Sequence, residues 1–327
     1  MSILVCGGAG YIGSHMVLEL IKKNYDVVVV DNLSNGHREL VDKNAKFYTC
    51  DIRDDSLMDN IIQKENVEAV IHFAAFSIVS ESMIDPAKYY DNNILATLSL
   101  LNTMRRNKIN KIVFSSTAAV YGEPESIPIH EDNSLRPINP YGETKLTIEK
   151  MLYWFDNAYN IKYSILRYFN VAGADENIKT GEMHNPETHL IPIILKSILE
   201  NKKIKIFGDD YPTQDGTCIR DYIHVTDLAI AHILALEKLN KTNKSEIYNL
   251  GNGNGFSVMQ IIKTAEKVTG KKINYEIAPR RIGDPAILIA SSEKAKKNLN
   301  WQPKFYEPEK IISTAWNWHK KLFLDKN

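Results

Sequence analysis

Short apolar runs alternate with amphipathic stretches along the first half of the chain. The apolar runs predict strands at 2–6, 26–30, 46–50, 68–74, 111–116 and 162–170. The stretches between them predict helices at 11–24, 55–65, 86–107 and 140–159. The four valines at 27–30 show no polar alternation, so we expect helices to cover both faces of their sheet. This order predicts an α/β fold built on a doubly wound parallel sheet.

The pattern changes after residue 174. The stretch 175–190, rich in Glu, His, Asn, Thr, Gly and Pro, predicts a loop. After it we predict helices at 190–201, 227–239, 256–268 and 307–325, with short strands at 204–207, 246–250 and 273–277. We therefore expect a first domain over 1–170 and a smaller C-terminal α/β domain over 171–327. Segments such as 246–250 could return to the first domain, and a ligand should bind between the two.

Composition narrows the classes of partner. The 327 residues include 40 basic and 40 acidic side chains, which gives no electrostatic reason to expect nucleic acid or a membrane surface. Cys6, Cys50 and Cys218 are odd in number and widely spaced, which suits a reducing compartment and no disulfide framework. We expect no metal site. With no leader-like pattern in "MSILVCGG", we expect a cytoplasmic protein.

The segment "GGAGYIG" at 7–13 follows the first predicted strand and opens the first helix. It satisfies G-x-G-x-x-G through Gly8, Gly10 and Gly13, and G-x-x-G-x-x-G if it begins at Gly7. Glycines allow a tight turn and let backbone N–H groups approach a pyrophosphate at the helix N-terminus. The alternative is a purely structural turn. The pattern favours a Rossmann dinucleotide site.

Two aspartates refine the choice of dinucleotide. Asp31 ends the second strand, where a carboxylate can accept hydrogen bonds from both ribose hydroxyls and would repel a 2′-phosphate. We therefore expect NAD rather than NADP. Asp51 follows the third strand and could meet the adenine amino group, although it could equally be a helix N-cap.

Tyr141 and Lys145, in "NPYGETK", lie about one helical turn apart and would share a face. A solvated helix face is the default explanation. The segment "FSSTAAVYG" upstream changes this, because it places Thr117 after the fifth strand, at the carboxyl edge that borders the ligand crevice. A nearby ammonium and a nicotinamide ring would favour the phenolate of Tyr141. That phenolate could take a proton from a substrate hydroxyl that Thr117 also contacts, while hydride leaves for NAD.

These motifs resemble those of the extended short-chain dehydrogenases/reductases and, within them, of the UDP-hexose 4-epimerases. The likeness extends through "GGAGYIGSH", "DNLSNGH", "YYDNN", "LRYFNVAGA", "FGDDYPTQDGTCIRDYIHVTDLA", "YNLGNGNGFSV" and "APRRIGDPA". It implies reversible C4 oxidation of a UDP-hexose, which interconverts UDP-galactose and UDP-glucose with a tightly bound NAD that is not consumed. Besides Gly7, Gly10, Gly13, Asp31, Asp51, Thr117, Tyr141 and Lys145, it implies NAD contacts at Tyr11, Ile12, Asn32, Asn35, Gly36, Ile52, Phe73, Ala74, Ala75, Asn92, Tyr168 and Phe169.

The same resemblance assigns substrate contacts in the second half. Arg forks bind phosphate oxygens through paired hydrogen bonds, and Arg220 and Arg281 are implied for the UDP diphosphate. The remaining implied contacts are Asn170, His189, Leu190, Lys205, Phe207, Tyr222 and Asp284, beside Thr117 and Tyr141. The alternative is that Arg220–Asp221 and Arg281–Asp284 are surface ion pairs. We assign His224 and His232 structural positions only.

Some positions depart from the family pattern. Ser77 stands where some members carry a lysine that faces the cofactor, and His189 stands where many have Asn. Leu288 aligns with the residue that limits sugar size, so UDP-N-acetylhexosamine or UDP-pentose substrates stay open. A 4,6-dehydratase is disfavoured, because Ala118 and Ala119 occupy the positions of its Asp–Glu pair. A non-catalytic NAD-sensing regulator is disfavoured by the retained tyrosine and lysine.

The resemblance also implies a homodimer formed by the helices at 86–107 and 140–159. Leu98, Leu101, Leu152 and Trp154 could face outward for this purpose, although packing in the core explains the leucines equally well.

Overall fold

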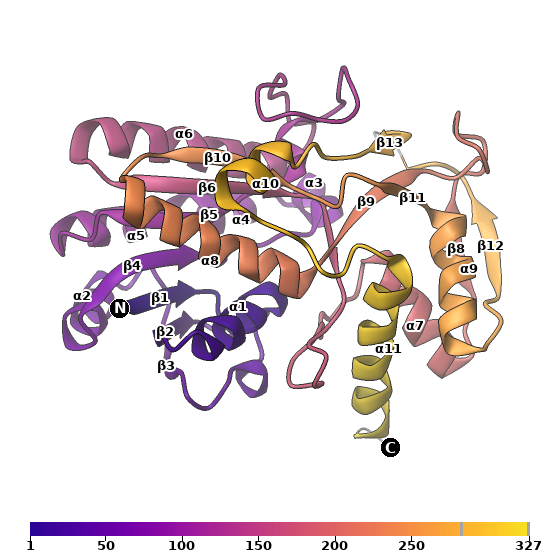
Figure 1. Ribbon diagram of the computed structural model, residues 1–327, viewed down its shortest axis with the longest axis horizontal. Coiled ribbons are helices and arrows are strands. Elements are labelled where there is room, and N and C mark those ends of the chain that lie inside the picture. The colour runs from indigo at the N-terminus through magenta and orange to yellow at the C-terminus, as the bar shows by residue number, and fades with distance from the viewer. Residues whose placement is uncertain (282–283, 326–327) are drawn as a thin grey trace.

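The computed structural model describes residues 1–281 and 284–325. Among these residues, seven parallel strands form the sheet of the larger lobe, in the order β10-β6-β5-β4-β1-β2-β3 (Figure 1). The strands are β1 Ser2–Cys6, β2 Asp26–Asp31, β3 Lys46–Thr49, β4 Val67–His72, β5 Lys111–Ser115, β6 Lys162–Tyr168 and β10 Glu246–Leu250. The sheet is that of a Rossmann-like fold, as the alternating apolar runs predicted.

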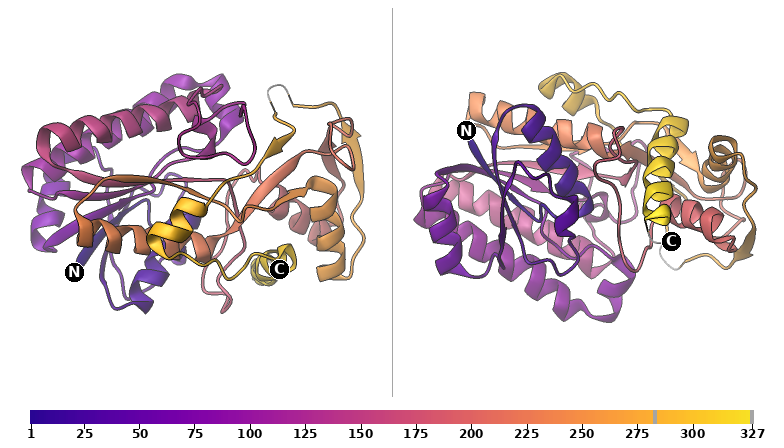
Figure 2. Two further views of the ribbon diagram at one scale, coloured as in Figure 1. Left: turned by 45° about the horizontal axis from the view of Figure 1, so that its top comes forward. Right: turned by 90° about the horizontal axis from the view of Figure 1, so that it is seen from below.

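Helices cover both faces of this sheet (Figure 2). Ile3 and Val5 of β1 face one core, which α1 Tyr11–Lys22, α8 Val225–Thr242 and α10 Glu293–Leu299 complete. Leu4 and Cys6 face a second core, built with α2 Asp55–Lys64, α5 Ala96–Arg106 and α6 Pro140–Tyr159. Alternate residues of one strand thus enter opposite cores, which explains why the four valines at 27–30 are all buried.

The helix predicted at 86–107 is divided in the structure. It consists of α4 Pro86–Tyr89, a π-helical segment Tyr90–Leu95 and α5. Asn93, in the π segment, donates from its side-chain amide to the carbonyl of Phe76 and the hydroxyl of Thr144, and accepts from the Phe76 N–H. These bonds tie the segment between β4 and β5 to α6. Short π segments of this kind are frequent at functional sites.

The smaller lobe is built mainly from the second half of the chain. Its elements are β7 Asn170–Ala172, α7 Leu190–Glu200, β8 Ile204–Phe207, β9 Ile219–His224, β11 Gly255–Ser257, α9 Val258–Thr269, β12 Tyr275–Ala278, β13 Ile287–Leu288 and α11 Pro308–Leu324. Strands β7, β9, β11 and β13 pair with one another, and β8 pairs with β12. The sequence pattern did not predict β9, β11 or β13, whose residues alternate too briefly.

The chain returns to the larger lobe after entering the smaller one. Helix α8 packs on α1, and β10 pairs in parallel with β6 over residues 246–250. Of the four outward positions considered, Leu101 and Leu152 lie fully in the core, whereas Leu98 and Trp154 are exposed. Over the described part of the chain, no helix combines the length and the apolar character needed to cross a membrane.

The remaining short elements lie around the edge of the large sheet. They are the helix α3 Val79–Ile84 and the 3-10 turns η1 Arg38–Leu40 and η3 Ala118–Val120. Turn η3 follows β5, so it stands at the carboxyl edge of the sheet, beside the N-terminus of α6. This is the edge where doubly wound sheets bind their ligands.

Candidate active site

The glycine loop is shaped by two positions that exclude any side chain. Gly7 has a positive φ of 80°, and a Cβ there would lie 2.5 Å from the backbone nitrogen of Ala74. A Cβ on Gly13 would lie 2.1 Å from the carbonyl oxygen of Gly7. Gly10 is the N-cap of α1, so the helix begins at this turn. Its first backbone N–H groups have no partner within the helix and face the loop. The loop forms a cradle for a pyrophosphate, and the residues present fit NAD there.

Asp31 fixes the loop beside the expected ribose position. Its Oδ2 accepts the N–H of Ala9 at 2.9 Å and its Oδ1 accepts the N–H of Leu33 at 2.8 Å. Each carboxylate oxygen can accept two hydrogen bonds, so both keep one free for a ribose hydroxyl. A Cβ on Gly36 would lie 2.9 Å from Oδ1 of this carboxylate. The glycine therefore keeps the approach to Asp31 open.

Asp51 is not a helix N-cap. The cap of α2 is Asp54, whose side chain accepts the N–H of Leu57 at 3.0 Å. Asp51 instead pairs with Arg53 at 2.8 Å and accepts from the amide of Asn32 at 3.3 Å. The hydrogen bonds from Arg53 hold the pKa of Asp51 at about 2. This carboxylate is half-buried and ionised at the end of β3, in the position expected for adenine recognition.

The other residues expected at NAD lie along the same edge. Phe73 and Ala74 donate their N–H groups to the carbonyl of Cys6, which joins the segment after β4 to β1. The Tyr11 hydroxyl donates to the carbonyl of Gly173 at 2.6 Å, so it joins α1 to the chain entering the smaller lobe. Asn35, Ile52, Ala75 and Phe169 follow β2, β3, β4 and β6, whereas Ile12 lies in the first turn of α1, Tyr168 ends β6 and Asn92 lies in the π segment.

Tyr141, Lys145 and Thr117 are brought together at the carboxyl end of β5. Helix α6 begins at Pro140, with Asn139 as its N-cap accepting the N–H of Gly142 at 2.8 Å. All three side chains are buried. Lys145 Nζ donates to the carbonyl of Ser115 at 2.9 Å, two residues before Thr117. The trio proposed from the sequence is therefore contiguous in space.

Burial dominates the titration of this trio in the protein alone. Desolvation raises the pKa of Tyr141 to about 12, although a hydrogen bond with Thr117 opposes the rise. Desolvation also lowers the pKa of Lys145 to about 7, opposed by the charge of Glu149. The expected activation of Tyr141 by the ammonium therefore does not appear without a further positive charge in the site.

A buried ion pair between Glu149 and Arg167 lies next to this trio. The sequence did not indicate it. Glu149, one turn beyond Lys145 on α6, accepts from Arg167 of β6 through Nη2 at 2.6 Å and Nε at 3.0 Å. It also accepts from the Ser116 hydroxyl at 2.5 Å. Arg167 donates in addition to the Tyr121 hydroxyl at 2.9 Å. This network connects the segment that carries Thr117 to the helix that carries Tyr141.

The arginines of the smaller lobe are not the surface pairs considered above. Arg220 of β9 forms an ion pair with Asp284, whereas Asp221 accepts backbone N–H groups from Asn252, Gly253 and Ala290. The guanidinium of Arg281 lies over the Phe207 ring, 4.1 Å from its centroid. The structure thus groups four of the predicted substrate residues in two pairs.

Four more of the predicted substrate residues lie on β7, β9, α7 and β8. Asn170 and Tyr222 are register partners in β7 and β9, where Asn170 is exposed and Tyr222 is buried. Leu190 opens α7, and Lys205 is exposed on β8. Leu288 pairs with Arg220 through β13 and β9 and packs beside Tyr121 in a small apolar cluster. His224 and His232 are buried within the core, and Ser77 is exposed.

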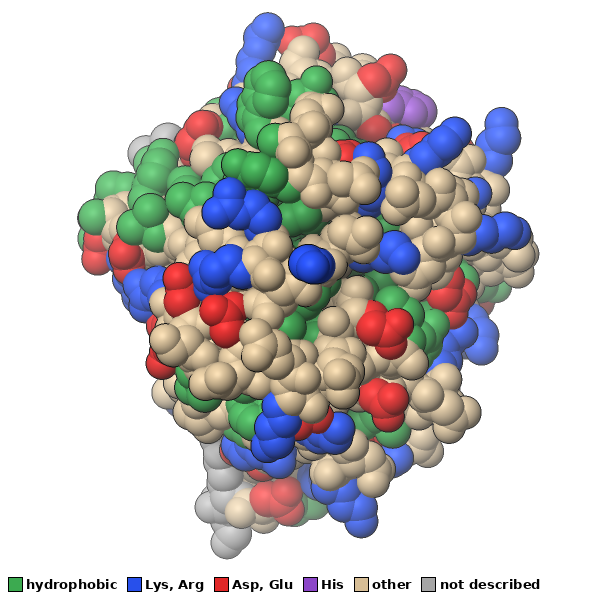
Figure 3. Space-filling view, turned by 90° about the vertical axis from the view of Figure 1, so that its left-hand side faces the viewer, with side chains coloured by type: hydrophobic (Ala, Val, Ile, Leu, Met, Phe, Trp, Pro, Cys, Tyr) green, Lys and Arg blue, Asp and Glu red, His purple; other side chains and the backbone are tan. Residues whose placement is uncertain are grey.

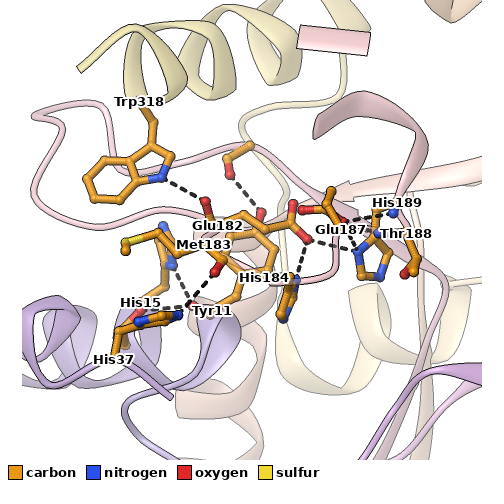
Figure 4. A network of polar contacts seen from close by, with 12 residues as sticks. Tyr11, His15, His37, Glu182, Met183, His184, Glu187, Thr188, His189 and Trp318 are labelled. Atoms are coloured by element: carbon orange, nitrogen blue, oxygen red, sulfur yellow. Dashed lines mark hydrogen bonds and ion pairs between the residues drawn. The ribbon is translucent and has the colours of Figure 1, made fainter. Parts of the chain in front are cut away.

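His189 faces carboxylates. Its Nδ1 lies 2.9 Å from Oε1 of Glu182 and 2.9 Å from Oε1 of Glu187 (Figure 4). Burial lowers the pKa of His189, but the two carboxylates outweigh it and raise the value to about 10. The carboxylates of Glu182 and Glu187 thus hold the His189 ring at the N-terminus of α7. Many relatives are expected to carry Asn at this position.

Known proteins resemble this chain in both sequence and structure. A model of the NAD-dependent epimerase/dehydratase family matches residues 3–251. The chain is 56% identical to a UDP-glucose 4-epimerase of Halalkalibacterium halodurans, over 98% of this chain and 96% of that protein. A crystal structure of UDP-glucose 4-epimerase superposes with a TM-score of 0.96, at 54% identity and 98% coverage of both chains. The Bifidobacterium longum enzyme, solved with NAD+ and UDP, gives a TM-score of 0.93 at 39% identity and 98% coverage of both chains.

Proposed function

The chain belongs to the NAD-dependent epimerase/dehydratase family, and from this premise we propose that it is an isomerase that interconverts UDP-galactose and UDP-glucose. The observation that carries the proposal is the burial of Tyr141, Thr117 and Lys145 together at the carboxyl edge of the sheet. This group can move one proton at one hydroxyl beside a dinucleotide cradle. Such chemistry is oxidation and reduction at a single carbinol carbon.

The proposed roles follow from these positions. Tyr141 takes the proton of the C4 hydroxyl and returns it when that carbon is reduced. Thr117 hydrogen-bonds the same oxygen and keeps it in line with the phenol. Lys145 holds the nicotinamide ribose and adds positive charge beside Tyr141. NAD, when bound, supplies the reversible hydride acceptor at C4 and is regenerated in each turnover, so it is held as a prosthetic group.

Arg220 and Arg281 supply the anchor for the diphosphate in this proposal. Arg220 is held by Asp284 and Arg281 by the Phe207 ring, so both guanidiniums are oriented before a substrate arrives. Because binding energy is placed on UDP, the 4-keto sugar is free to turn and present its other face. Reduction of the ketone from that face inverts the configuration at C4.

The absence of carboxylates after Thr117 separates this reaction from dehydration. A 4,6-dehydratase must remove water across C5 and C6, which requires an acid and a base. This chain carries Ala118 and Ala119 in the corresponding positions, within η3. The oxidised sugar is therefore returned to the alcohol.

We further propose a homodimer in the cytoplasm. Large apolar side chains are exposed on α3 to α5 and on α6, namely Val79, Met83, Ile84, Tyr90, Leu95, Leu98, Tyr153, Trp154 and Tyr159. Figure 3 views the larger lobe from its outer end. Hydrophobic side chains gather toward the upper left of this face. A contiguous exposed apolar surface favours a protein partner, and a second copy of the chain would cover it. The three free, buried cysteines suit a reducing compartment.

The test is an assay without added cofactor. Purified protein is incubated with UDP-galactose and the sugar products are resolved by chromatography. We expect UDP-glucose to form, because NAD remains bound through purification. Failure to form UDP-glucose both with and without added NAD would refute the proposal. UDP-N-acetylgalactosamine in a parallel reaction defines the sugar range that Leu288 permits.

A variant pair tests the role of Tyr141. Tyr141→Phe removes the proton carrier and should lower turnover by about 100- to 10,000-fold, the usual contribution of general acid–base catalysis. NAD content should stay near that of the unmodified protein. Tyr306→Phe, at an exposed tyrosine outside the proposed site and the proposed dimer surface, is the matched control and should keep full activity. Near-normal turnover of Tyr141→Phe would contradict the assigned role.

A further inference from the structure

The loop after β7 gathers two imidazoles and two carboxylates within eight residues. Glu182, His184, Glu187 and His189 follow the spacing E-x-H-x-x-E-x-H. One ligand atom from each lies within 4.8 Å of the others (Figure 4). The sequence analysis expected no metal site, and it placed His189 at the substrate. The grouping is independent of the reaction proposed above.

The contacts in this cluster converge on the same few atoms. Oε1 of Glu182 lies 2.8 Å from Nδ1 of His184 and 2.9 Å from Nδ1 of His189. Nδ1 of His189 also lies 2.9 Å from Oε1 of Glu187. A single N–H cannot point directly at two carboxylates, so hydrogen bonds alone satisfy this geometry poorly.

We propose that Glu182, His184, Glu187 and His189 form a binding site for one zinc ion. Zinc takes four ligands in a tetrahedron, with bonds of about 2.0–2.2 Å to imidazole nitrogen and carboxylate oxygen. The ligand atoms of such a tetrahedron lie about 3.3 Å apart, which follows from those bond lengths. The direct contacts of 2.8–2.9 Å in the cluster are shorter than this value, so the side chains would rotate apart to admit the ion.

The ligand set favours zinc over the alkaline-earth ions. Calcium and magnesium prefer six or more oxygen ligands, whereas two imidazoles with two carboxylates suit zinc. Two ionised carboxylates also balance the charge of a divalent cation, which on binding would release to solvent the proton that the same carboxylates otherwise hold on His189. The side chains of Glu182 and Glu187 are only 4% and 6% exposed, so a compensating cation among them is electrostatically favourable.

Neighbouring groups hold the loop from outside the cluster. Trp318 of α11 donates its indole N–H to the carbonyl of Glu182 at 3.0 Å, and a ring nitrogen of His37 contacts the carbonyl of Met183 at 3.1 Å. The Tyr11 ring packs edge-on against His184, with centroids 6.1 Å apart. These contacts come from both lobes, so the loop is positioned before an ion binds.

The two histidines provide the route of entry. The side chains of His184 and His189 are 31% and 49% exposed, whereas the carboxylates lie beneath them. An ion can therefore reach the carboxylates from solvent between the rings. Four protein ligands make this a closed site of structural type, which would fix the loop at the N-terminus of α7 and keep the His189 ring away from a sugar.

The test measures zinc binding directly. Tag-free protein, stripped with a chelator and desalted, is titrated with Zn2+ in competition with a chromophoric chelator, and metal content is measured by elemental mass spectrometry. We expect one zinc per chain. Co2+ in place of zinc should give the visible absorption of a tetrahedral complex. Stoichiometric zinc should also raise the melting temperature.

Three variants connect the binding to the cluster. His184→Ala removes an exposed ligand and Glu182→Gln removes a buried one with little change of shape. Each should weaken zinc binding by more than the roughly 10- to 100-fold that loss of an outer-shell partner costs. His130→Ala removes an exposed imidazole elsewhere and should bind zinc normally.

Circular dichroism and NAD content distinguish loss of the site from loss of the fold in each variant. Zinc binding equal in the unmodified chain and in His184→Ala would overturn the proposal. So would failure of the unmodified, folded chain to bind stoichiometric zinc. Neither result bears on the proposed reaction, because these experiments measure zinc binding and not epimerase activity.

Discussion

Replacing Glu149 by glutamine should strongly destabilise the protein. The side chains of Glu149 and Arg167 are 4% and 2% exposed, and Arg167 donates to the carboxylate through Nη2 at 2.6 Å and Nε at 3.0 Å. Glutamine keeps the size of the side chain but removes its charge, and its amide group would face the donors of Arg167. A buried guanidinium without its counter-ion costs about 3–5 kcal/mol. That is a large part of the roughly 5–15 kcal/mol that holds a typical domain folded.

The free energy of unfolding from urea titrations measures this cost, and a double-mutant cycle separates its source. Glu149→Gln/Arg167→Met removes both charges, so it should recover much of the stability lost in the single variant. Glu125→Gln is the matched control, because its ion pair with Arg136 spans 3.5 Å between side chains 68% and 77% exposed. It should change stability by less than about 1 kcal/mol.

The same variant should affect the active site through Lys145. Burial lowers the pKa of Lys145 and the charge of Glu149 partly restores it, so Glu149→Gln should lower that pKa further. The pH profile of turnover should then shift, whereas a purely structural defect would lower activity at every pH. A loss of stability no larger than that of Glu125→Gln would refute the reasoning, as would a double variant less stable than Glu149→Gln.

Three further changes follow from the geometry. Burial lowers the pKa of Lys145 from 10.5 to about 7, so the unfolded chain binds more protons between these values and stability should rise with pH there. In protein freed of NAD, urea titrations should show that Lys145→Met lacks this rise, and equal slopes would contradict the assignment. Gly13→Ala should lose bound NAD and melt earlier because its Cβ would meet a carbonyl at 2.1 Å, whereas Gly10→Ala, with 3.5 Å available, should keep its melting temperature. Arg220→Lys should raise the KM for UDP-galactose without loss of NAD, because a lysine cannot form the paired hydrogen bonds of a guanidinium; an unchanged KM would exclude Arg220 from the diphosphate site.

The local signals of the larger lobe were sufficient to predict its strands and its glycine loop. Asp31 and Gly13 are separated by one helix and one strand, and the spacing alone placed them together because parallel strands end at one edge. Thr117 and Tyr141 follow the same logic. The helix at 86–107 was predicted, but its interruption was not, because the π segment depends on Asn93, whose partners Phe76 and Thr144 lie far away in the chain.

Contacts in the smaller lobe were less predictable. Arg220 pairs with Asp284 rather than with its neighbour Asp221, because alternate residues of β9 point to opposite sides of their sheet. The cluster of Glu182 and His189 was not predicted, because it lies in a segment whose composition predicted only a loop. A loop's conformation depends on what packs on it, here Trp318 and His37. The sequence order contains no local signal for such contacts.

The titration of Tyr141 and Lys145 would couple the proposed reaction to the cofactor. Burial raises the pKa of Tyr141 to about 12 and lowers that of Lys145 to about 7, so near pH 7 the protein alone keeps Tyr141 neutral and Lys145 only partly protonated. A neutral phenol is a poor base, and a partly protonated amine gives it only part of a positive charge. A positive nicotinamide ring bound beside Tyr141 would favour the phenolate, and the neutral reduced ring would favour the phenol. In the proposed reaction, Tyr141 would lose its proton more readily when the ring is oxidised and keep it more readily when the ring is reduced. Under this proposal, the burial that raises the pKa of Tyr141 is what would make its protonation depend on the oxidation state of the cofactor.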